Sequence, residues 1–221
     1  MDQHLDVGVP LERRAENGKS ETIHGQDHDN FAPVLKETVE TLHADRVPFA
    51  LIGGIAVSSF GRPRWTHDID VLIRPHDADR ALNLLKKRDF RTERTDPSWL
   101  FKAFKLDVMV DLIFYCTGGF YFEPEMMERA VWRELFGSRM PVLAPEDLLL
   151  LKAAVHDEVG PRHWHDALGI LARTRLDWDY LLHRSQRAPR RLLSLLVYAH
   201  SIDLDVPNHV VQALYRRVYE P

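Results

Sequence analysis

Hydrophobic residues recur along this chain at two different periods, which predict a mixed first part and a helical second part. Over residues 31–42 they repeat at intervals of three and four positions, a spacing that predicts a helix ending before the next proline. The apolar run of residues 49–52 then predicts a short buried strand. That run stops at Gly53 and Gly54, after which small and β-branched residues predict the start of a second helix.

Two later segments alternate between hydrophobic and polar residues, as strands with one buried face do. In DIDVLI the aliphatic side chains would be buried on one face, and Asp68 and Asp70 would lie together on the other. The segment LDVMVDLIFY alternates in the same way and places Asp107 and Asp111 on its more polar face. The sequence therefore predicts two strands that each carry acidic residues on one side.

Helical spacing dominates elsewhere. Residues 77–90 predict an amphipathic helix with Asp77 as its N-cap, which would cover the sheet. After about residue 141 the strand pattern gives way to further predicted helices over residues 144–157, 163–173, 177–185, 189–201 and 208–220. We expect an α+β fold with three parts: a flexible leader (1–30), a small mixed β-sheet core flanked by helices (31–140), and a C-terminal helical bundle (141–221).

Composition limits the classes of protein that this chain can be. Its 221 residues, 45% of them hydrophobic and 28% charged, suffice for one domain or two small ones with a real core. No apolar run approaches the roughly 18–20 residues of a membrane span, and the N-terminus lacks a signal-peptide pattern. A single cysteine, Cys116, favours a reducing compartment, so we expect a cytoplasmic location without membrane association. The net charge of −4 removes the global electrostatic case for a dedicated nucleic-acid binder.

The paired aspartates need an explanation, because like charges repel and burial adds to the cost. A divalent cation would supply the missing positive charge, and Mg²⁺ or Mn²⁺ suits the hard oxygen ligands of Asp68, Asp70 and Asp111. Two alternatives stay open at this point. Asp68 and Asp70 could be solvent-facing residues at the start of a strand, and Asp107 could replace Asp111 as the third ligand.

The glycine pair could bind the phosphates of a substrate beside the metal ion. Without side chains, Gly53 and Gly54 would let backbone N–H groups approach phosphate oxygens at a helix N-terminus, and Ser58 and Ser59 lie just beyond. A Gly-Gly turn alone most often marks a tight loop. Its combination with the Asp68-x-Asp70 pair and a later strand acid is more specific.

These residues resemble the signature of a known superfamily. The stretch LIGGIAVSSFGRPRWTHDIDVLI is similar to that of the DNA-polymerase-β-like nucleotidyltransferases, with an apolar strand, Gly-Gly and Asp-x-Asp. RPRWTHDIDVLI also resembles the Arg-x-Thr-x-Asp-Ile-Asp form of small prokaryotic members. VLAPEDLLLLKAAV and RHWHDALGIL resemble the helical region of AbiEii-type, toxin-related nucleotidyltransferases. The resemblance covers roughly residues 35–175.

The resemblance implies roles for individual residues. Gly53 and Gly54, with Ser58 or Ser59, would hold a triphosphate; Asp68 and Asp70 would bind metal; Asp111 would help to activate an acceptor hydroxyl. Lys152 would approach the nucleotide phosphates, and Arg64 and Thr66 fall at motif positions near the nucleotide. The chain departs from the pattern where His165, instead of lysine, precedes Asp166. Lys152 could instead be a surface lysine whose stem covers apolar neighbours.

Three other groups of side chains allow a functional and a structural interpretation. His156, His163 and His165 fit no usual zinc spacing, so we expect solvated or hydrogen-bonded histidines. A basic run is expected to be a solvated face, with RNA phosphate contacts as the alternative; it consists of Arg184, Arg187, Arg190 and Arg191. The aromatic residues of the helical part are expected to pack within it rather than to stack on bases; they are Trp164, Trp178 and Tyr180.

The resemblance predicts a metal-dependent nucleotidyltransferase that moves a nucleoside monophosphate from a nucleoside triphosphate to an acceptor hydroxyl and releases pyrophosphate. The acceptor could be a tRNA end, a protein or a small molecule such as an antibiotic. The alternative is a catalytically silent member of the fold that acts as a toxin or antitoxin partner or as a nucleotide-binding module. An RNA-binding module without chemistry is disfavoured by the acidic net charge.

Overall fold

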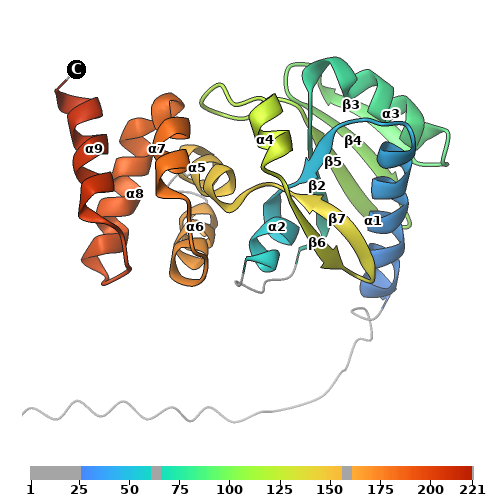
Figure 1. The fold of residues 1–221 in the computed structure, drawn as a ribbon. Helices are drawn as coiled ribbons and strands as arrows, with labels where there is room; N and C mark the ends of the chain where they lie inside the picture. Colours follow the sequence, from blue (N-terminus) through green and yellow to red (C-terminus); the bar gives the residue numbers. More distant parts are fainter. Residues whose placement is uncertain (1–25, 61–65, 156–160, 221) are drawn as a thin grey trace, which may run out of the picture.

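The computed structural model describes residues 26–60, 66–155 and 161–220. Within them the chain forms a mixed sheet and a set of helices (Figure 1). The strands are β1 (Phe49–Leu51), β2 (Asp68–Ile73), β3 (Arg91–Asp96), β4 (Leu100–Lys105), β5 (Val108–Ile113), β6 (Val131–Leu135) and β7 (Ser138–Val142). The α-helices are α1 (Gln26–Ala44), α2 (Gly53–Ser59), α3 (Ala78–Lys86), α4 (Pro124–Glu128), α5 (Pro145–Val155), α6 (Arg162–Arg173), α7 (Trp178–Arg184), α8 (Pro189–Ser201) and α9 (Asn208–Tyr219).

The sheet has the strand order β3-β4-β5-β2-β1-β7-β6. β2 runs parallel to β5 and β1 runs parallel to β7, whereas the other neighbouring strands are antiparallel. The predicted α+β class with a mixed sheet flanked by helices and a helical C-terminal part is therefore confirmed. The centre of the sheet, where β5, β2 and β1 lie side by side, carries the two acidic segments identified in the sequence.

Alternation along the central strands decides which face each side chain takes. On β5 every second residue, beginning at Val108, is buried, while the residues between are only partly buried. Helices α1 and α3 pack on that side of the sheet, against β5 and, for α3, also against β3 and β4. The opposite face of the central strands carries the aspartates of β2 and β5, as the alternation predicted.

The helices after the sheet lie together on its other side (Figure 1). Helix α5 packs against α6, α7 and α8, and α9 packs against α8 and α7. Buried leucines, among them Leu148, Leu181, Leu192 and Leu214, join these helices to the main core cluster. The predicted division of the chain at residue 140 stays a prediction; β7 continues to Val142, and α5 begins at Pro145.

The structure corrects several boundaries. The helix predicted from residue 31 begins at Gln26, and the one predicted over residues 77–90 ends at Lys86, because the chain turns at Asp89 with a φ of 62°. Asp77 stands at the N-cap position of α3, but its carboxylate accepts a hydrogen bond from Arg74 Nε at 2.6 Å and makes no capping bond. The leader predicted over residues 1–30 lies largely outside the described residues.

None of the helices described here is both long enough and apolar enough to cross a membrane.

Candidate active site

One row of residues crosses the centre of the sheet and brings the sequence-predicted carboxylates together. Asp70 on β2 lies directly opposite Asp111 on the parallel strand β5, and Asp111 lies opposite Lys102 on the antiparallel strand β4. Asp68 precedes Asp70 by two residues and therefore shares its face. Strand pairing alone thus places three carboxylates and one ammonium group side by side.

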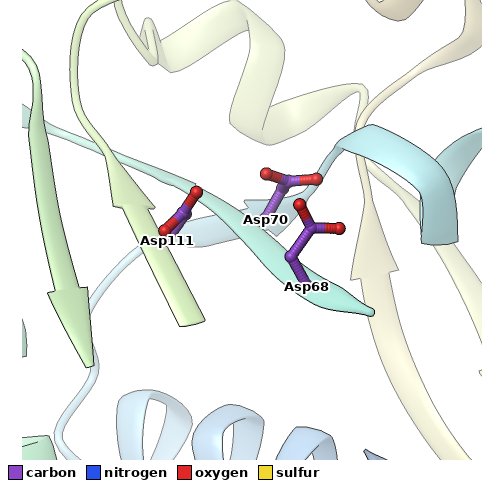
Figure 2. Close-up of side chains that lie close together, drawn as sticks. All are labelled: Asp68, Asp70 and Asp111. Atoms are coloured by element: carbon purple, nitrogen blue, oxygen red, sulfur yellow. The ribbon is translucent and has the colours of Figure 1, made fainter. Parts of the chain in front are cut away.

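The three carboxylates form a compact group (Figure 2). One oxygen from each of Asp68, Asp70 and Asp111 lies within 4.8 Å of the other two. Asp107, the alternative third ligand, is exposed in the turn between β4 and β5 and is not part of this group. A set of three carboxylates without nitrogen or sulfur donors suits a hard divalent cation such as Mg²⁺.

Gly53 gives Asp70 its space. It follows β1 with a φ of +62°, in the left-handed region that glycine tolerates best. A Cβ atom at this position would lie 1.7 Å from Asp70 Oδ2 and 2.6 Å from Asp70 Cγ. The Asp70 carboxylate therefore lies against the backbone at the start of α2, where only a residue without a side chain fits.

Thr66 holds the first carboxylate. Its hydroxyl donates a hydrogen bond to Asp68 Oδ1 at 2.5 Å. The same hydroxyl lies 3.3 Å from the Asp68 carbonyl oxygen. Thr66 thus fixes the orientation of a metal-ligand candidate, which gives the predicted motif threonine a concrete contact.

Lys102 neutralises the third carboxylate and was not identified from the sequence. Its Nζ atom donates a hydrogen bond to Asp111 Oδ1 at 2.7 Å. The pKa of Asp111 lies above its ordinary value, chiefly because of burial and with a smaller contribution from the charge of Asp68. The hydrogen bond and the charge of Lys102 act in the opposite direction and lower this pKa in part. The turn at Leu106 and Asp107 fixes this hairpin register, but Leu-Asp is not one of the common turn pairs, so the signal was weak.

A cavity of about 540 Å³ opens over the carboxylates, between the sheet and helices α5 and α6. The three aspartates line it from the sheet, Gly53 lines it from the start of α2, and Lys152 and Leu148 line it from α5. Its volume lies within the roughly 300–1,000 Å³ that is typical of small-molecule sites. Further lining residues that the sequence did not indicate are Ser98, Trp99, Ile113, Tyr115, Thr117 and Arg162.

Lys152 faces this cavity from a buried position. Its side chain is only 7% exposed, and Nζ lies 3.1 Å from Asp166 Oδ2 and 3.5 Å from His163 Nδ1. The alternative of a surface lysine is therefore wrong. Asp166 is fully buried, and His165 is exposed. His156 lies outside the described residues, so the predicted state of the whole histidine group is not tested.

The other predicted nucleotide-binding residues are less close to the carboxylates. Gly54, Ser58 and Ser59 lie on α2 but do not belong to the described residues that line the cavity. The Ser59 hydroxyl donates to the Ala56 carbonyl of the same helix at 2.8 Å. Arg64 lies outside the described residues.

Cys116 also lines the cavity. Burial raises the pKa of its thiol to about 12, and the nearby charge of Asp70 adds to the shift. Because the thiolate is the reactive form, the raised pKa disfavours Cys116 as a nucleophile.

Half of the basic run takes part in internal ion pairs. Arg184 Nη1 lies 2.5 Å from Glu123 Oε2, and its Nε donates to Asp147 Oδ1 at 3.0 Å. Arg187 also pairs with Glu123. Burial and these acidic partners explain why the prediction of a solvated face is wrong for Arg184, whereas Arg190 and Arg191 are exposed.

The aromatic residues of the helical part pack as predicted. Tyr180 is buried, and its hydroxyl donates to Asp147 Oδ2 at 2.7 Å. Trp164 makes an edge-to-face contact with Tyr198 at a centroid distance of 5.9 Å, and Trp178 packs against the core.

Comparison with known proteins agrees with this geometry. Residues 32–174 match the family described as "Nucleotidyl transferase of unknown function (DUF2204)". The chain belongs to this family. The match spans the sheet, the three aspartates and the helices through α6, so this nucleotidyltransferase carries its acidic group inside the region that defines its family. Membership in the AbiEii-type group is not confirmed by this match.

Solved structures share the fold at low identity. An antigenic nucleotidyltransferase-like protein from Paracoccidioides brasiliensis aligns with a TM-score of 0.56 and 17% identity, over 87% of this chain and 98% of that one. The structure of ANT(2″)-Ia in complex with adenylyl-2″-tobramycin aligns with a TM-score of 0.51 and 14% identity, over 78% and 98%. Comparison of the sequence with curated proteins gives no match.

Proposed function

We propose that this nucleotidyltransferase moves a nucleoside monophosphate group from a nucleoside triphosphate to a hydroxyl of a small molecule. The observation that carries the proposal is the group of three carboxylates within 4.8 Å of one another at the wall of a cavity. In the reaction, the acceptor oxygen forms a bond to the α-phosphorus, the bond from that phosphorus to the bridging oxygen breaks, and pyrophosphate leaves.

The chain's own residues would bind and orient the reactants. Asp68, Asp70 and Asp111 would hold Mg²⁺ or Mn²⁺, which supplies positive charge to the triphosphate oxygens when bound. Asp111 would accept the hydroxyl proton of the acceptor. Lys152 faces the same cavity from α5 and would contact phosphate oxygens, supported by its position beside Asp166. Gly53 would bring the backbone at the start of α2 close to the triphosphate.

Two features of the chain favour a small-molecule acceptor over RNA. Arg184 and Arg187, the first residues of the basic run, are engaged with acidic side chains of the same chain. The net charge of −4 offers no general attraction for phosphate backbones. In its solved structure, ANT(2″)-Ia is in complex with adenylyl-2″-tobramycin, an adenylylated antibiotic. That complex supports an acceptor of this size for the present chain, and ATP as the first nucleotide to test.

A protein partner is a second candidate function. Exposed hydrophobic side chains on α8 and α9 favour it, because Tyr198 and Tyr215 are 48% and 52% exposed and Tyr219 is 64% exposed. The resemblance to AbiEii-type proteins suggests a cognate toxin or antitoxin as the partner. Co-purification of a stable complex, together with triphosphate binding but no turnover, would favour this silent role over the enzyme. The single cysteine supports a cytoplasmic location for either function.

The test uses pure protein with Mg²⁺ and each of four α-labelled nucleoside triphosphates. Total RNA, a protein extract and a panel of hydroxyl-bearing antibiotics serve as separate acceptors. The proposal expects label in the small-molecule fraction with the wild type and none with Asp70→Asn. Label in RNA or protein would overturn the acceptor class, and transfer that is unchanged in Asp70→Asn would overturn the role of the carboxylates.

A further inference from the structure

The cavity over the carboxylates has two chemically different ends. One end is formed by α5 and α6 and carries basic side chains, among them Lys152 and Arg162. The other end is formed by the turn between β3 and β4 and by the end of β5, and it carries Trp99, Ile113 and Tyr115. One cavity thus joins a basic end to an aromatic and aliphatic end.

The strand order separates these ends across the carboxylates. β5 and then β4 follow on one side of β2, and β1 follows on the other side. Helix α2 begins directly after β1 and packs against α6, whose Asp166 lies 3.1 Å from Lys152 Nζ. Asp111 lies on the β5 side of Asp68 and Asp70 (Figure 2). The basic end therefore lies towards β1, and the aromatic end lies towards β4, beyond Asp111.

A row of side chains leads from the third carboxylate into the aromatic end. Asp111 and Ile113 on β5, and Tyr115 just after it, are spaced by two residues and line the same cavity. The ring of Tyr115 packs against that of Tyr121 at a centroid distance of 5.0 Å, which restrains its orientation. The acid that would accept the proton of the acceptor is thus followed by an aliphatic and then an aromatic side chain.

Trp99 borders this row from the turn between β3 and β4. Its carbonyl accepts a hydrogen bond from the backbone N–H of Phe114 at 3.0 Å, and its indole N–H donates to Asp96 Oδ2 at 3.1 Å. The residue lines the cavity and is 40% exposed. Because the indole N–H already has a partner, the ring offers apolar surface to a ligand.

The charges near this end disfavour a cationic acceptor. Among the described residues that line the cavity, the carboxylates are those of the three aspartates that would hold the metal. The Lys102 ammonium group lies 2.7 Å from Asp111 Oδ1 and would repel a second cation there. Asp96 does not belong to the described lining, and its oxygens accept hydrogen bonds from Ser98 and Trp99. The described lining therefore offers an ammonium group of an acceptor no carboxylate of its own.

The direction of the reaction assigns the two ends. In an in-line displacement, the attacking oxygen approaches the phosphorus from the side opposite the leaving group. The leaving pyrophosphate is anionic and suits the basic end. The acceptor hydroxyl then approaches from the aromatic end, beside Asp111.

We propose that the acceptor is an uncharged hydroxyl compound that carries an aromatic or other flat apolar ring. Trp99 and Tyr115 select this compound by packing against its ring, so both are specificity-determining residues. The inference rests on the proposed nucleotidyl transfer and names the chemical class of its acceptor.

The first test compares three sets of acceptors with the full wild-type chain, Mg²⁺ and a mixture of four α-labelled nucleoside triphosphates. Aryl glycosides carry hydroxyls and an uncharged aromatic ring, the corresponding methyl glycosides lack the ring, and aminoglycosides carry charged amines. Transfer to the aryl glycosides is expected to exceed transfer to the methyl glycosides about tenfold in kcat/KM, with none to the aminoglycosides. Equal or better transfer to either of the other sets would overturn the inference and leave nucleotidyl transfer intact. Transfer to none of the sets would overturn the small-molecule acceptor as well.

Substitution of Trp99 separates the acceptor from the nucleotide. With the best aryl glycoside, Trp99→Ala is expected to raise the KM for the acceptor about tenfold and to leave the KM for the nucleotide unchanged, because a stacked ring is lost. Trp99→Phe keeps a flat ring and is expected to raise the acceptor KM less than about threefold. A raised nucleotide KM with an unchanged acceptor KM would assign the aromatic end to the nucleobase and overturn the inference.

Trp132→Ala is the matched control. Trp132 lies on β6, is 45% exposed and does not belong to the described lining of this cavity. Its substitution is expected to leave both KM values unchanged, and thermal melting checks that each variant is folded. Because the comparison of acceptors uses the wild type, the test does not depend on the folding of a variant.

Discussion

Substitution of Gly53 tests the geometry of the site through one added methyl group. In Gly53→Ala the new Cβ would lie 1.7 Å from Asp70 Oδ2, far inside van der Waals contact. The positive φ of +62° adds strain, because an L-residue in the left-handed region costs roughly 1–2 kcal/mol. In a chain of this size, a loss of about 1 kcal/mol lowers the melting temperature by roughly 2–4 °C. We therefore expect the backbone strain of Gly53→Ala alone to lower the melting temperature by roughly 2–8 °C.

The effect on catalysis should be much larger than the effect on stability. Asp70 has a short side chain and lies on a central strand. Relief of the clash therefore requires its carboxylate group to move. A misplacement of about 1 Å in a catalytic arrangement costs on the order of 10²-fold in rate. We expect at least this loss in kcat/KM for nucleotidyl transfer, together with weaker binding of Mn²⁺.

Gly137 provides the matched control. It lies in the turn between β6 and β7 with a φ of +71°, and a Cβ atom there would meet nothing within 4 Å. Gly137→Ala therefore carries the same kind of backbone strain without a clash, and should lose similar stability but keep its activity. The assays are thermal melting and steady-state transfer kinetics. Folded Gly53→Ala with wild-type activity would refute the argument that Asp70 needs this space.

Three further substitutions have defined outcomes. Thr66→Val removes the hydroxyl that orients Asp68 and should weaken Mn²⁺ binding about 10–100-fold in a metal titration, whereas unchanged affinity would contradict the positioning role. Tyr180→Phe removes a hydrogen bond to the buried Asp147 carboxylate and should cost about 1.5–3 kcal/mol in urea unfolding; a loss below about 0.5 kcal/mol would contradict it. Burial raises the pKa of Glu123, but the hydrogen bonds and charges of two arginines outweigh burial and hold that pKa below the ordinary value of 4.5. The stability that ionised Glu123 contributes is therefore present above pH 4.5 and disappears as the pH falls through the lower pKa of the folded state. Glu123→Gln should therefore be less stable than the wild type at pH 7, with a difference that shrinks below pH 4.5 in unfolding measured against pH; a constant difference would contradict the assignment.

Central strands and amphipathic helices could be predicted from the sequence because their burial follows a period. The segment DIDVLI forms β2 over the predicted residues, and α8 covers the predicted 189–201. Both elements have one buried face, so the hydrophobic pattern and the structure carry the same information. The carboxylate group could be predicted for the same reason, since alternation assigns Asp68 and Asp70 to one face.

Edge strands could not be predicted from this signal. β3, with the sequence RTERTD, and β6, with VWREL, lie at the two edges of the sheet and are largely exposed. Charged edge residues prevent association with other sheets but remove the alternation that marks a strand. Because β3 was missed, its hairpin partner β4 was missed too, and with it Lys102. The helical spacing of residues 144–157 does not indicate which acidic side chain is buried, yet Asp147 of α5 is buried and accepts hydrogen bonds from α7.

The position of the label in the product tests the central claim most directly. Pure protein with Mg²⁺, ATP and an accepted small molecule would be assayed in parallel with α-labelled and γ-labelled ATP. Nucleotidyl transfer predicts that the α label enters the acceptor and that the γ label leaves as pyrophosphate, with both signals lost in Asp70→Asn. Entry of the γ label into the acceptor would mean phosphoryl transfer by another chemistry, and would contradict the account.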